Sequence, residues 1–202
     1  TPAFEAWKKA NTFAQKQMGY VAVGLPIKTG DIASDKARKL ADLIEQFTRD
    51  DNRFSVGQSI LLRDVKEEHL LALYRALEKL DLHRIGFHKI NDIVTCPGTD
   101  TCNLGIASSM GLADELQKLI ETEFYSLINT HDIQIKISGC MNACGQHSMA
   151  SIGFHGSSLK AADKRVLPAL QVLLGGATLG NGEGKIADKV IKVPSKRGPK
   201  VL

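Results

Sequence analysis

The chain of 202 residues lacks several features that mark particular classes of protein. It has no apolar run near the roughly 20 residues that a membrane-spanning helix needs. Its first residues, TPAFEAWKKANTFAQK, lack the apolar core of a secretory signal peptide. The formal net charge is only +4, which suits anionic ligands but is too weak to indicate a nucleic-acid-binding protein. These absences leave a globular protein of the reducing cytoplasm as the expected class.

Repeats, low-complexity segments and a phosphate-binding loop are also missing from the sequence. The glycine-rich stretch GNGEG at 180–184 does not continue into the Gly-Lys-Ser/Thr ending of a phosphate loop. We therefore interpret it as a turn. Hydrophobic residues make up 43% of the chain and charged residues 24%, which is ordinary for a protein with a real core.

The first 82 residues are predicted to alternate strands and helices. VAVGLPI at 21–27 is a β-rich apolar run, and a helix follows that Ser34 or Asp35 can cap. A second strand is predicted over 53–65, with a possible interruption at its glycine, and an amphipathic helix over 67–80. This order resembles half of a ferredoxin-like fold. A unit this short has little core of its own, so we expect it to pack on another part of the protein.

The remainder of the chain is predicted to combine one long helix with several strands. Residues 103–129 have helical periodicity, whereas 133–137 (IQIKI) alternates as a strand does. Further β-like runs occupy 150–156 and 169–176, and a last one, KVIKV, ends shortly before the C-terminus. The expected buried stripe of the helix consists of Leu112, Leu116, Leu119, Ile120, Phe124 and Leu127.

All four cysteines of the chain lie in two tight pairs. Cys96 and Cys102 form a C-x5-C pair in TCPGTDTC, and Cys140 and Cys144 form a C-x3-C pair in SGCMNACGQH. Each pair follows a strand-like run and is surrounded by small residues, which let backbone N–H groups approach sulfur. The spacing permits the four thiolates to converge on one site.

Three interpretations of the pairs stay open on spacing alone. Cysteine is a common core residue, so the thiols could simply be buried, although two pairs in glycine-rich loops argue against this. A disulfide or structural zinc is the second interpretation, but C-x5-C is wider than the usual zinc spacing. The third is a four-cysteine iron–sulfur cluster, and the spacing alone favours it in about half of all cases.

A family resemblance favours the cluster. TCPGTDTCNLGIA followed by ISGCMNACGQHSMASIGF resembles the signature of siroheme-dependent nitrite and sulfite reductases. Upstream, GYVAVGLPIKTGDIASDKARKLADLIEQF and RFSVGQSILLRDV are similar to the ferredoxin-like half domain of that family. The sequence departs from the family at Ser151, where an acidic residue is usual. SVGQ at 55–58 also lacks the arginine that the first half of the family's catalytic unit carries.

The resemblance implies a set of cofactor-binding residues. Cys96, Cys102, Cys140 and Cys144 would hold a [4Fe-4S] cluster, and Cys144 would also bridge it to the siroheme iron. No catalytic residue is assigned here, because the arginine and lysine residues that bind the anion are expected in the other half of the enzyme. The residues expected near siroheme are Asn142, Gln58, Gly175 and Gly176.

The resemblance also implies the fold, domains and activity. The expected fold is α+β, with a ferredoxin-like half domain at 1–88 and a siroheme/[4Fe-4S] half domain with a mixed sheet at 89–202. The implied activity is six-electron reduction of nitrite or sulfite, with electrons from ferredoxin or a flavoprotein. The missing initiator Met and the single pair of half domains lead us to expect the C-terminal fragment of a longer oxidoreductase. A small single-pair reductase is one alternative. A non-catalytic iron–sulfur electron-transfer or zinc module is another.

Several basic residues are secondary candidates for contact with siroheme carboxylates. His147 and His155 flank the strand-like run ASIGF, but each is more readily interpreted as a surface or satisfied core histidine. The lysine and arginine candidates are more readily interpreted as solvated surface charges, and they are Lys136, Lys160, Lys164 and Arg165.

Overall fold

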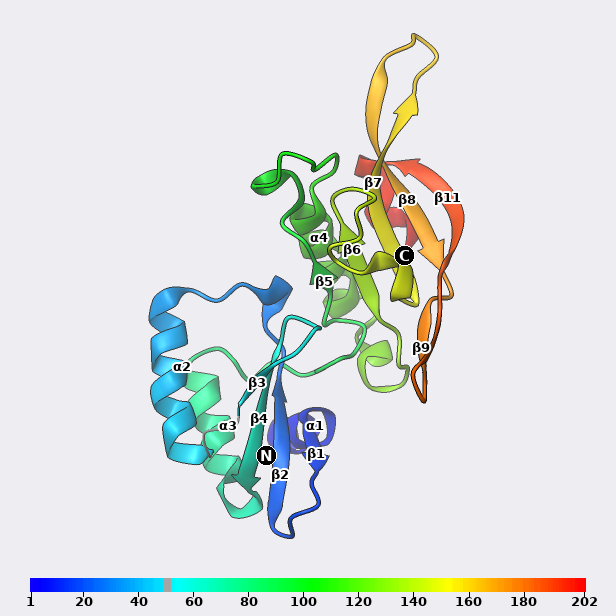
Figure 1. The fold of residues 1–202 in the computed structure, drawn as a ribbon. Helices are drawn as coiled ribbons and strands as arrows, with labels where there is room; N and C mark the ends of the chain where they lie inside the picture. Colours follow the sequence, from blue (N-terminus) through cyan, green and yellow to red (C-terminus); the bar gives the residue numbers. More distant parts are fainter. Residues whose placement is uncertain (49–51) are drawn as a thin grey trace. The chain divides into compact units, whose positions relative to one another are not determined.

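Residues Thr1–His88 fold around a four-stranded antiparallel sheet, and Lys89–Leu202 fold around a five-stranded mixed sheet. We call these two parts the first unit and the second unit (Figure 1). The computed structural model describes residues 1–48 and 52–202. Among the helices of these residues, none is both long enough and apolar enough to cross a membrane.

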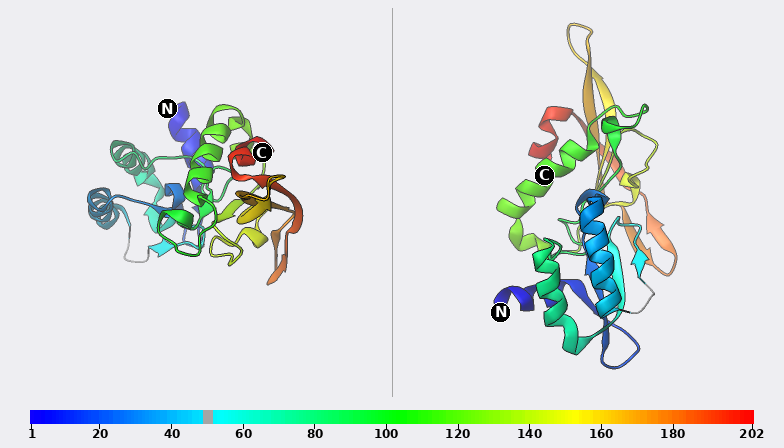
Figure 2. Two further views of the ribbon diagram at one scale, coloured as in Figure 1. Left: turned by 90° about the horizontal axis from the view of Figure 1, so that it is seen from above. Right: turned by 90° about the vertical axis from the view of Figure 1, so that its left-hand side faces the viewer.

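The first unit has the sheet order β1-β2-β4-β3. Its helices α2 and α3 lie side by side in Figure 1 and in the right view of Figure 2. The elements in chain order are α1 (Pro2–Asn11), β1 (Thr12–Ala14), β2 (Tyr20–Leu25), η1 (Lys28–Gly30), α2 (Ser34–Phe47), β3 (Arg53–Phe54), β4 (Ile60–Lys66), η2 (Glu67–His69) and α3 (Leu70–Lys79).

The core of the first unit lies between its sheet and its helices. Trp7 of α1 has no exposed surface and its ring lies 5.3 Å from that of Tyr74 of α3, measured between centroids. On β2, Gly24 leaves room for the ring of Phe87, because a Cβ atom at position 24 would lie only 2.2 Å from Phe87 Cγ. The side chain of Asn11 accepts a hydrogen bond from the backbone of Gly86 at 3.0 Å. The 84–87 segment is thereby held in the first unit.

The second unit has the sheet order β11-β8-β7-β6-β5, in which β5, β6 and β7 are parallel and β7, β8 and β11 are antiparallel. Helices α4 and η6 contact one another, as the right view of Figure 2 shows. Its elements are β5 (Val94–Thr95), η3 (Gly98–Asp100), α4 (Ser109–Thr122), η4 (Tyr125–Asn129), β6 (Ile135–Ser138), η5 (His147–Met149), β7 (Ile152–Lys160), β8 (Val166–Leu174), β9 (Ala177–Gly180), β10 (Glu183–Lys185), β11 (Asp188–Pro194) and η6 (Ser195–Val201).

The expected α+β class with a mixed sheet is confirmed, while several element boundaries differ from expectation. Helix α2 begins at Ser34, and the residue before it, Ala33, makes no side-chain cap. The strand predicted over 53–65 is a hairpin of β3 and β4, because five residues around Gly57 turn the chain back. The predicted helix over 103–129 is shortened to α4, since 103–108 form part of a cysteine-bearing loop. Helix α1 was not predicted, and η6 closes the end of the chain where no element was expected.

Candidate functional site

The two cysteine pairs lie on loops that follow neighbouring parallel strands of the second unit. Val94 of β5 pairs with Lys136 of β6, and Thr95 pairs with Ile137. Cys96 directly follows β5, and its N–H donates to the carbonyl of Ile137 at 3.2 Å. Gly139 and Cys140 directly follow β6. Since the carboxyl ends of parallel strands meet at one edge of a sheet, both pairs begin at the same edge.

Backbone contacts lock the two loops together around Gly139. Its carbonyl accepts hydrogen bonds from the N–H groups of Ile106 at 2.8 Å and Ala107 at 3.1 Å. Its own N–H donates to the Sγ of Cys96 at 3.1 Å. One loop thus supplies a backbone donor to a thiol of the other, as expected where protein groups stabilise thiolate charge.

Glycines make this close approach sterically possible. A Cβ atom at Gly139 would lie 2.5 Å from the Cα of Gly98, and one at Gly105 would lie 2.7 Å from the carbonyl carbon of Gly98. From β7, a Cβ atom at Gly156 would lie 1.9 Å from the carbonyl oxygen of Gly139. These contacts involve backbone atoms, which cannot turn aside as a side chain can. The positions of Cys96 and Cys140 are therefore set by backbone packing.

The four thiols are free in this structure and differ in exposure. Cys140 is 9% exposed and Cys96 is half-buried, whereas Cys102 and Cys144 are exposed. Within the described part of the chain, His, Cys, Asp and Glu side chains form no group of three or more that is close enough to hold a single metal ion.

The turn that carries Cys144 folds back on β6. Ala143 and Gln146 adopt left-handed backbone conformations, with φ of 59° each. The N–H of Gly145 donates to the hydroxyl of Ser138 at 3.0 Å, and a Cβ atom at position 145 would lie 2.1 Å from the carbonyl oxygen of Ile137. This tight turn buries Gly145 and leaves Asn142 and Cys144 at the surface.

The other residues expected near siroheme lie in different surroundings. Gly175 is exposed with φ of 84°, as a turn requires. Gly176 is buried against the segment that follows Cys144, because its Cβ would lie 2.6 Å from the carbonyl oxygen of Ala150. Gln58 belongs to the first unit, where it is half-buried in a left-handed conformation with φ of 61°.

His147 and His155 form a buried pair in the second unit. Their ring centroids are 4.8 Å apart, and their exposed fractions are 4% and 6%. The Nδ1 of His155 lies 2.9 Å from the carbonyl oxygen of Gly156, whereas the buried Nδ1 of His147 has no hydrogen-bond partner among residues 1–48 and 52–202. Burial, and then the nearby charges of His155 and Lys189, lower the pKa of His147 to about 4. His147 is therefore neutral at pH 7.

The basic candidates on the second unit are not gathered in one place. Lys136 is half-buried, burial lowers its pKa, and its Nζ donates to the side-chain oxygen of Gln146 at 2.8 Å. Lys160, Lys164 and Arg165 are exposed on the β7–β8 hairpin. Only Lys136 is thus bonded to the turn that carries the second cysteine pair.

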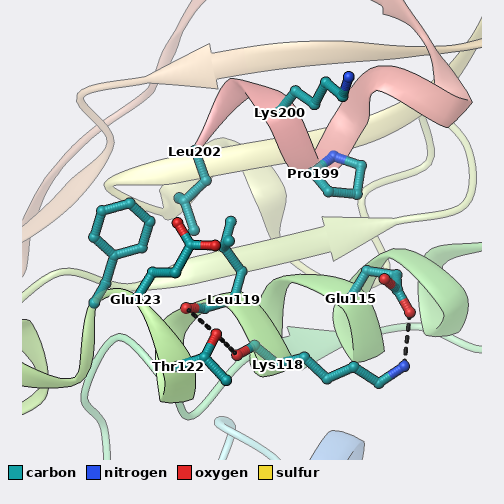
Figure 3. Close-up of a pocket in the computed structure, with 9 residues that line it drawn as sticks. Glu115, Lys118, Leu119, Thr122, Glu123, Pro199, Lys200 and Leu202 are labelled. Atoms are coloured by element: carbon teal, nitrogen blue, oxygen red, sulfur yellow. Dashed lines mark hydrogen bonds and ion pairs between the residues drawn. The ribbon is translucent and has the colours of Figure 1, made fainter.

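A surface groove of about 460 Å³ lies away from the cysteines, between the C-terminal half of α4 and η6 (Figure 3). In it, Lys118 bonds Glu115 at 2.7 Å, and the hydroxyl of Thr122 donates to the carbonyl of Lys118 at 2.9 Å. Opposite charges thus meet there, in the ion pair of Lys118 with Glu115. The groove is lined by Glu115, Lys118, Leu119, Thr122, Glu123, Phe124, Pro199, Lys200 and Leu202.

Ser109 is not among the residues expected from the sequence, although it is part of the cysteine site. It is the first residue of α4 and has no exposed surface. Its hydroxyl donates to the carbonyl of Cys96 at 2.6 Å. A helix that begins with two serines immediately after a cysteine loop was the available signal, but serine at a helix start is so common that it does not single out this residue.

The fold and the site together define an α+β protein with paired thiols on interlocked loops, a framework suited to an iron–sulfur cluster. Comparison with known proteins shows what the chain resembles. Residues 13–80 match the nitrite/sulfite reductase ferredoxin-like half domain, so the resemblance seen in the sequence is confirmed.

Relatives extend this match over most of the chain. The chloroplastic ferredoxin–nitrite reductase of Zea mays is 28% identical over 185 residues, which are 90% of this chain and 32% of that protein. Sulfite reductase [ferredoxin] 2 of Mycolicibacterium paratuberculosis is 29% identical over 168 residues, which are 82% of this chain and 30% of that protein. The chain thus spans about a third of the length of these relatives.

Solved structures agree with the sequence relatives. The NirA protein of Mycobacterium tuberculosis matches with a TM-score of 0.77 and 25% identity, over 93% of this chain and 35% of that chain. Dissimilatory sulfite reductase I matches with a TM-score of 0.69 at 8% identity, over 85% of this chain and 57% of that chain. This second likeness concerns the fold alone.

Proposed function

We propose that the chain is part of a siroheme/[4Fe-4S] oxidoreductase that reduces nitrite to ammonia or sulfite to sulfide with six electrons. The observation that carries the proposal is the pair of cysteine loops, locked together at one sheet edge with a backbone N–H aimed at Cys96. Relatives named as nitrite and sulfite reductases support it. In this proposal 1–88 is the ferredoxin-like half domain and 89–202 is the siroheme/[4Fe-4S] half domain.

The donor set fits an iron–sulfur cluster in its chemistry. Thiolates are the usual ligands of such clusters, and hydrogen bonds to sulfur tune their potential. We assign Cys96, Cys102, Cys140 and Cys144 as the cluster ligands, and Cys144 as the ligand shared with siroheme. Its exposure on the outer side of a tight turn supports this assignment. When bound, the cofactors supply electrons one at a time to an anion that must accept several.

The protein groups around the cofactors have positioning roles in this proposal. Asn142 lies at the surface of the same turn as Cys144, where its amide can hydrogen-bond to a macrocycle. Gly175 and Gly176 let the backbone approach closely, although the close contact of Gly176 in this structure is with Ala150. Gln58 is assigned a siroheme contact from the family resemblance.

The proposed reaction needs partners beyond this chain. The anion, nitrite or sulfite, is bound by arginine and lysine residues of the other half of the enzyme. Electrons come from ferredoxin or a flavoprotein, and two relatives carry ferredoxin in their names. Four free thiols suit a reducing compartment such as the cytoplasm.

Anaerobic reconstitution with iron and sulfide tests the proposal. We expect the chain to gain broad visible absorbance and bound iron. Cys102→Ala should abolish both, because it removes one ligand on an exposed turn. The matched control is Leu104→Ala, a truncation of a 66% exposed side chain in the same loop that leaves the thiols in place.

Each competing function gives a different result in the same experiment. Zinc uptake without visible absorbance would identify the zinc module. A cluster that forms equally well in Cys102→Ala and Leu104→Ala would overturn the ligand assignment. Adding siroheme separates a reductase half from an electron carrier, since bound siroheme adds an intense band and a red band. We expect this binding to be weak in the chain alone, because half of the haem pocket is expected in the other half of the enzyme.

A further inference from the structure

Ser109 is a fully buried polar residue whose hydroxyl is not used to cap its helix. The N-cap of α4 is the preceding residue, Ser108, whose hydroxyl accepts from the N–H of Gly111 at 3.2 Å. Ser109 has no exposed surface and follows the loop that carries the first cysteine pair. Buried hydroxyls are normally hydrogen-bonded, so the partners of Ser109 indicate its role.

Both partners of the Ser109 hydroxyl belong to Cys96. The hydroxyl donates to the Cys96 carbonyl oxygen at 2.6 Å. Its oxygen also lies 3.7 Å from the Sγ of Cys96, a contact in which either atom can donate. The N–H of Gly139 reaches the same sulfur at 3.1 Å from the other loop. Cys96 is therefore held by two groups from two elements that are distant in sequence.

The hydroxyl occupies the space next to Gly98 that a side chain at position 98 would need. A Cβ atom at Gly98 would lie 2.2 Å from the Oγ of Ser109. Gly98 also has φ of 56°, a conformation that favours glycine. Ser109 is thus fitted between Cys96 and Gly98.

We propose that Ser109 is a positioning residue for Cys96, which it orients and whose sulfur charge it stabilises; this inference rests on the proposed cluster. A hydroxyl has one proton and two lone pairs. With a protonated thiol, it donates to the Cys96 carbonyl and accepts from sulfur. With a thiolate, its proton can turn to sulfur and join the Gly139 N–H as a second donor. Donors to a ligating thiolate withdraw charge and raise the reduction potential of the cluster.

The first test uses the chain without cofactor. Alkylation by iodoacetamide at one fixed pH is followed by mass spectrometry, and the rate at Cys96 is divided by the rate at the exposed Cys102. Ser109→Ala should lower this ratio about 3- to 10-fold, because iodoacetamide reacts with the thiolate and loss of one hydrogen bond to sulfur reduces the thiolate fraction. Ser109→Thr keeps the hydroxyl and should restore the ratio. Ser108→Ala is the matched control, because it removes the adjacent hydroxyl and only weakens the helix start.

The second test measures the reduction potential of the reconstituted cluster. Ser109→Ala should make the potential more negative, whereas Ser109→Thr and Ser108→Ala should leave it unchanged. A purely structural role would lower cluster yield without moving the potential. An unchanged potential, or an alkylation ratio equal to that of the wild type, overturns the inference. If the wild-type chain takes up no cluster, the proposed function fails, while the alkylation ratio still decides whether Ser109 controls Cys96.

Discussion

The interlock between the cysteine loops predicts that Gly156→Ala loosens the second unit locally. The new Cβ would lie 1.9 Å from the Gly139 carbonyl oxygen and 3.1 Å from the Ala107 nitrogen. These atoms belong to the backbone, so β7 and the loops must move apart. Overpacking of this kind costs about 1–3 kcal/mol. Losing the two hydrogen bonds that Ile106 and Ala107 donate to Gly139 adds about 1–3 kcal/mol.

Amide hydrogen exchange at Ile106 and Ala107 measures this loss directly. A decrease of about 2 kcal/mol, near the low end of the sum, should speed exchange about 30-fold. The matched control is Gly184→Ala, whose Cβ would meet only the flexible end of Met149 at 3.0 Å and a carbonyl oxygen at 3.5 Å. Equal exchange rates in the two variants would show that the contact of Gly156 with Gly139 does not hold the cysteine loops together. That result would refute the interlock of the two loops as the support of the cysteines.

Two further predictions concern the core of each unit. Gly24→Ala should destabilise the first unit by about 1–3 kcal/mol, because the new Cβ would overlap the Phe87 ring. Urea unfolding followed by the fluorescence of Trp7, the single tryptophan, measures this loss, and an unchanged midpoint would contradict the prediction. His147, whose folded pKa of about 4 lies below its ordinary 6.5, should make the second unit lose about 3 kcal/mol as the pH falls from 6.5 to 4, since the unfolded chain binds the extra proton more readily. Circular dichroism in urea at several pH values should show this slope in the wild type and a flatter one in His147→Gln.

The sequence predicted those elements whose periodicity extends over several residues. Leu112, Leu116 and Ile120 were expected on the buried stripe of the 103–129 helix, and they are 6%, 0% and 0% exposed. The same prediction was wrong for Phe124 and Leu127, which lie beyond the end of α4. The helical periodicity of the sequence continues beyond residue 122, but Glu123 is the C-cap of α4. Local pattern thus gives the element and its face more reliably than its ends.

The missed helix α1 illustrates a different reason for failure. Phe4 and Trp7 are spaced for a helix, yet the segment is short and polar, and a short helix depends on tertiary packing. Here that packing comes from Tyr74, whose ring lies 5.5 Å from Phe4 and 5.3 Å from Trp7. The partner is more than sixty residues away, so no local pattern could reveal it.

The candidate site shows the same division between local and distant information. Motif spacing was enough to select the four cysteines as candidates, and their assignment as ligands stays a prediction. The spacing could not reveal that Gly156 of β7 presses on Gly139, or that Ser109 bonds Cys96. The first contact arises because parallel pairing of β6 with β7 brings Ser138 beside His155, so that Gly139 and Gly156 follow next to one another. The second joins the start of α4 to the residue after β5. Packing between elements, not the motif, therefore determines which residues support the thiols.

The unequal surroundings of the thiols suggest a division of labour in the proposed site. Cys96 and Cys140 are held by backbone contacts that form when the sheet forms. Cys102 and Cys144 are exposed, although their turns also make backbone hydrogen bonds, from the Cys102 N–H to the Gly98 carbonyl and from the Gly145 N–H to the Ser138 hydroxyl. In the proposed site, two ligands are thus buried or half-buried and two face outward. Substitution of the interlocked glycines should therefore impair the site even where no ligand is changed, because these glycines let the backbone hold Cys96 and Cys140 in place.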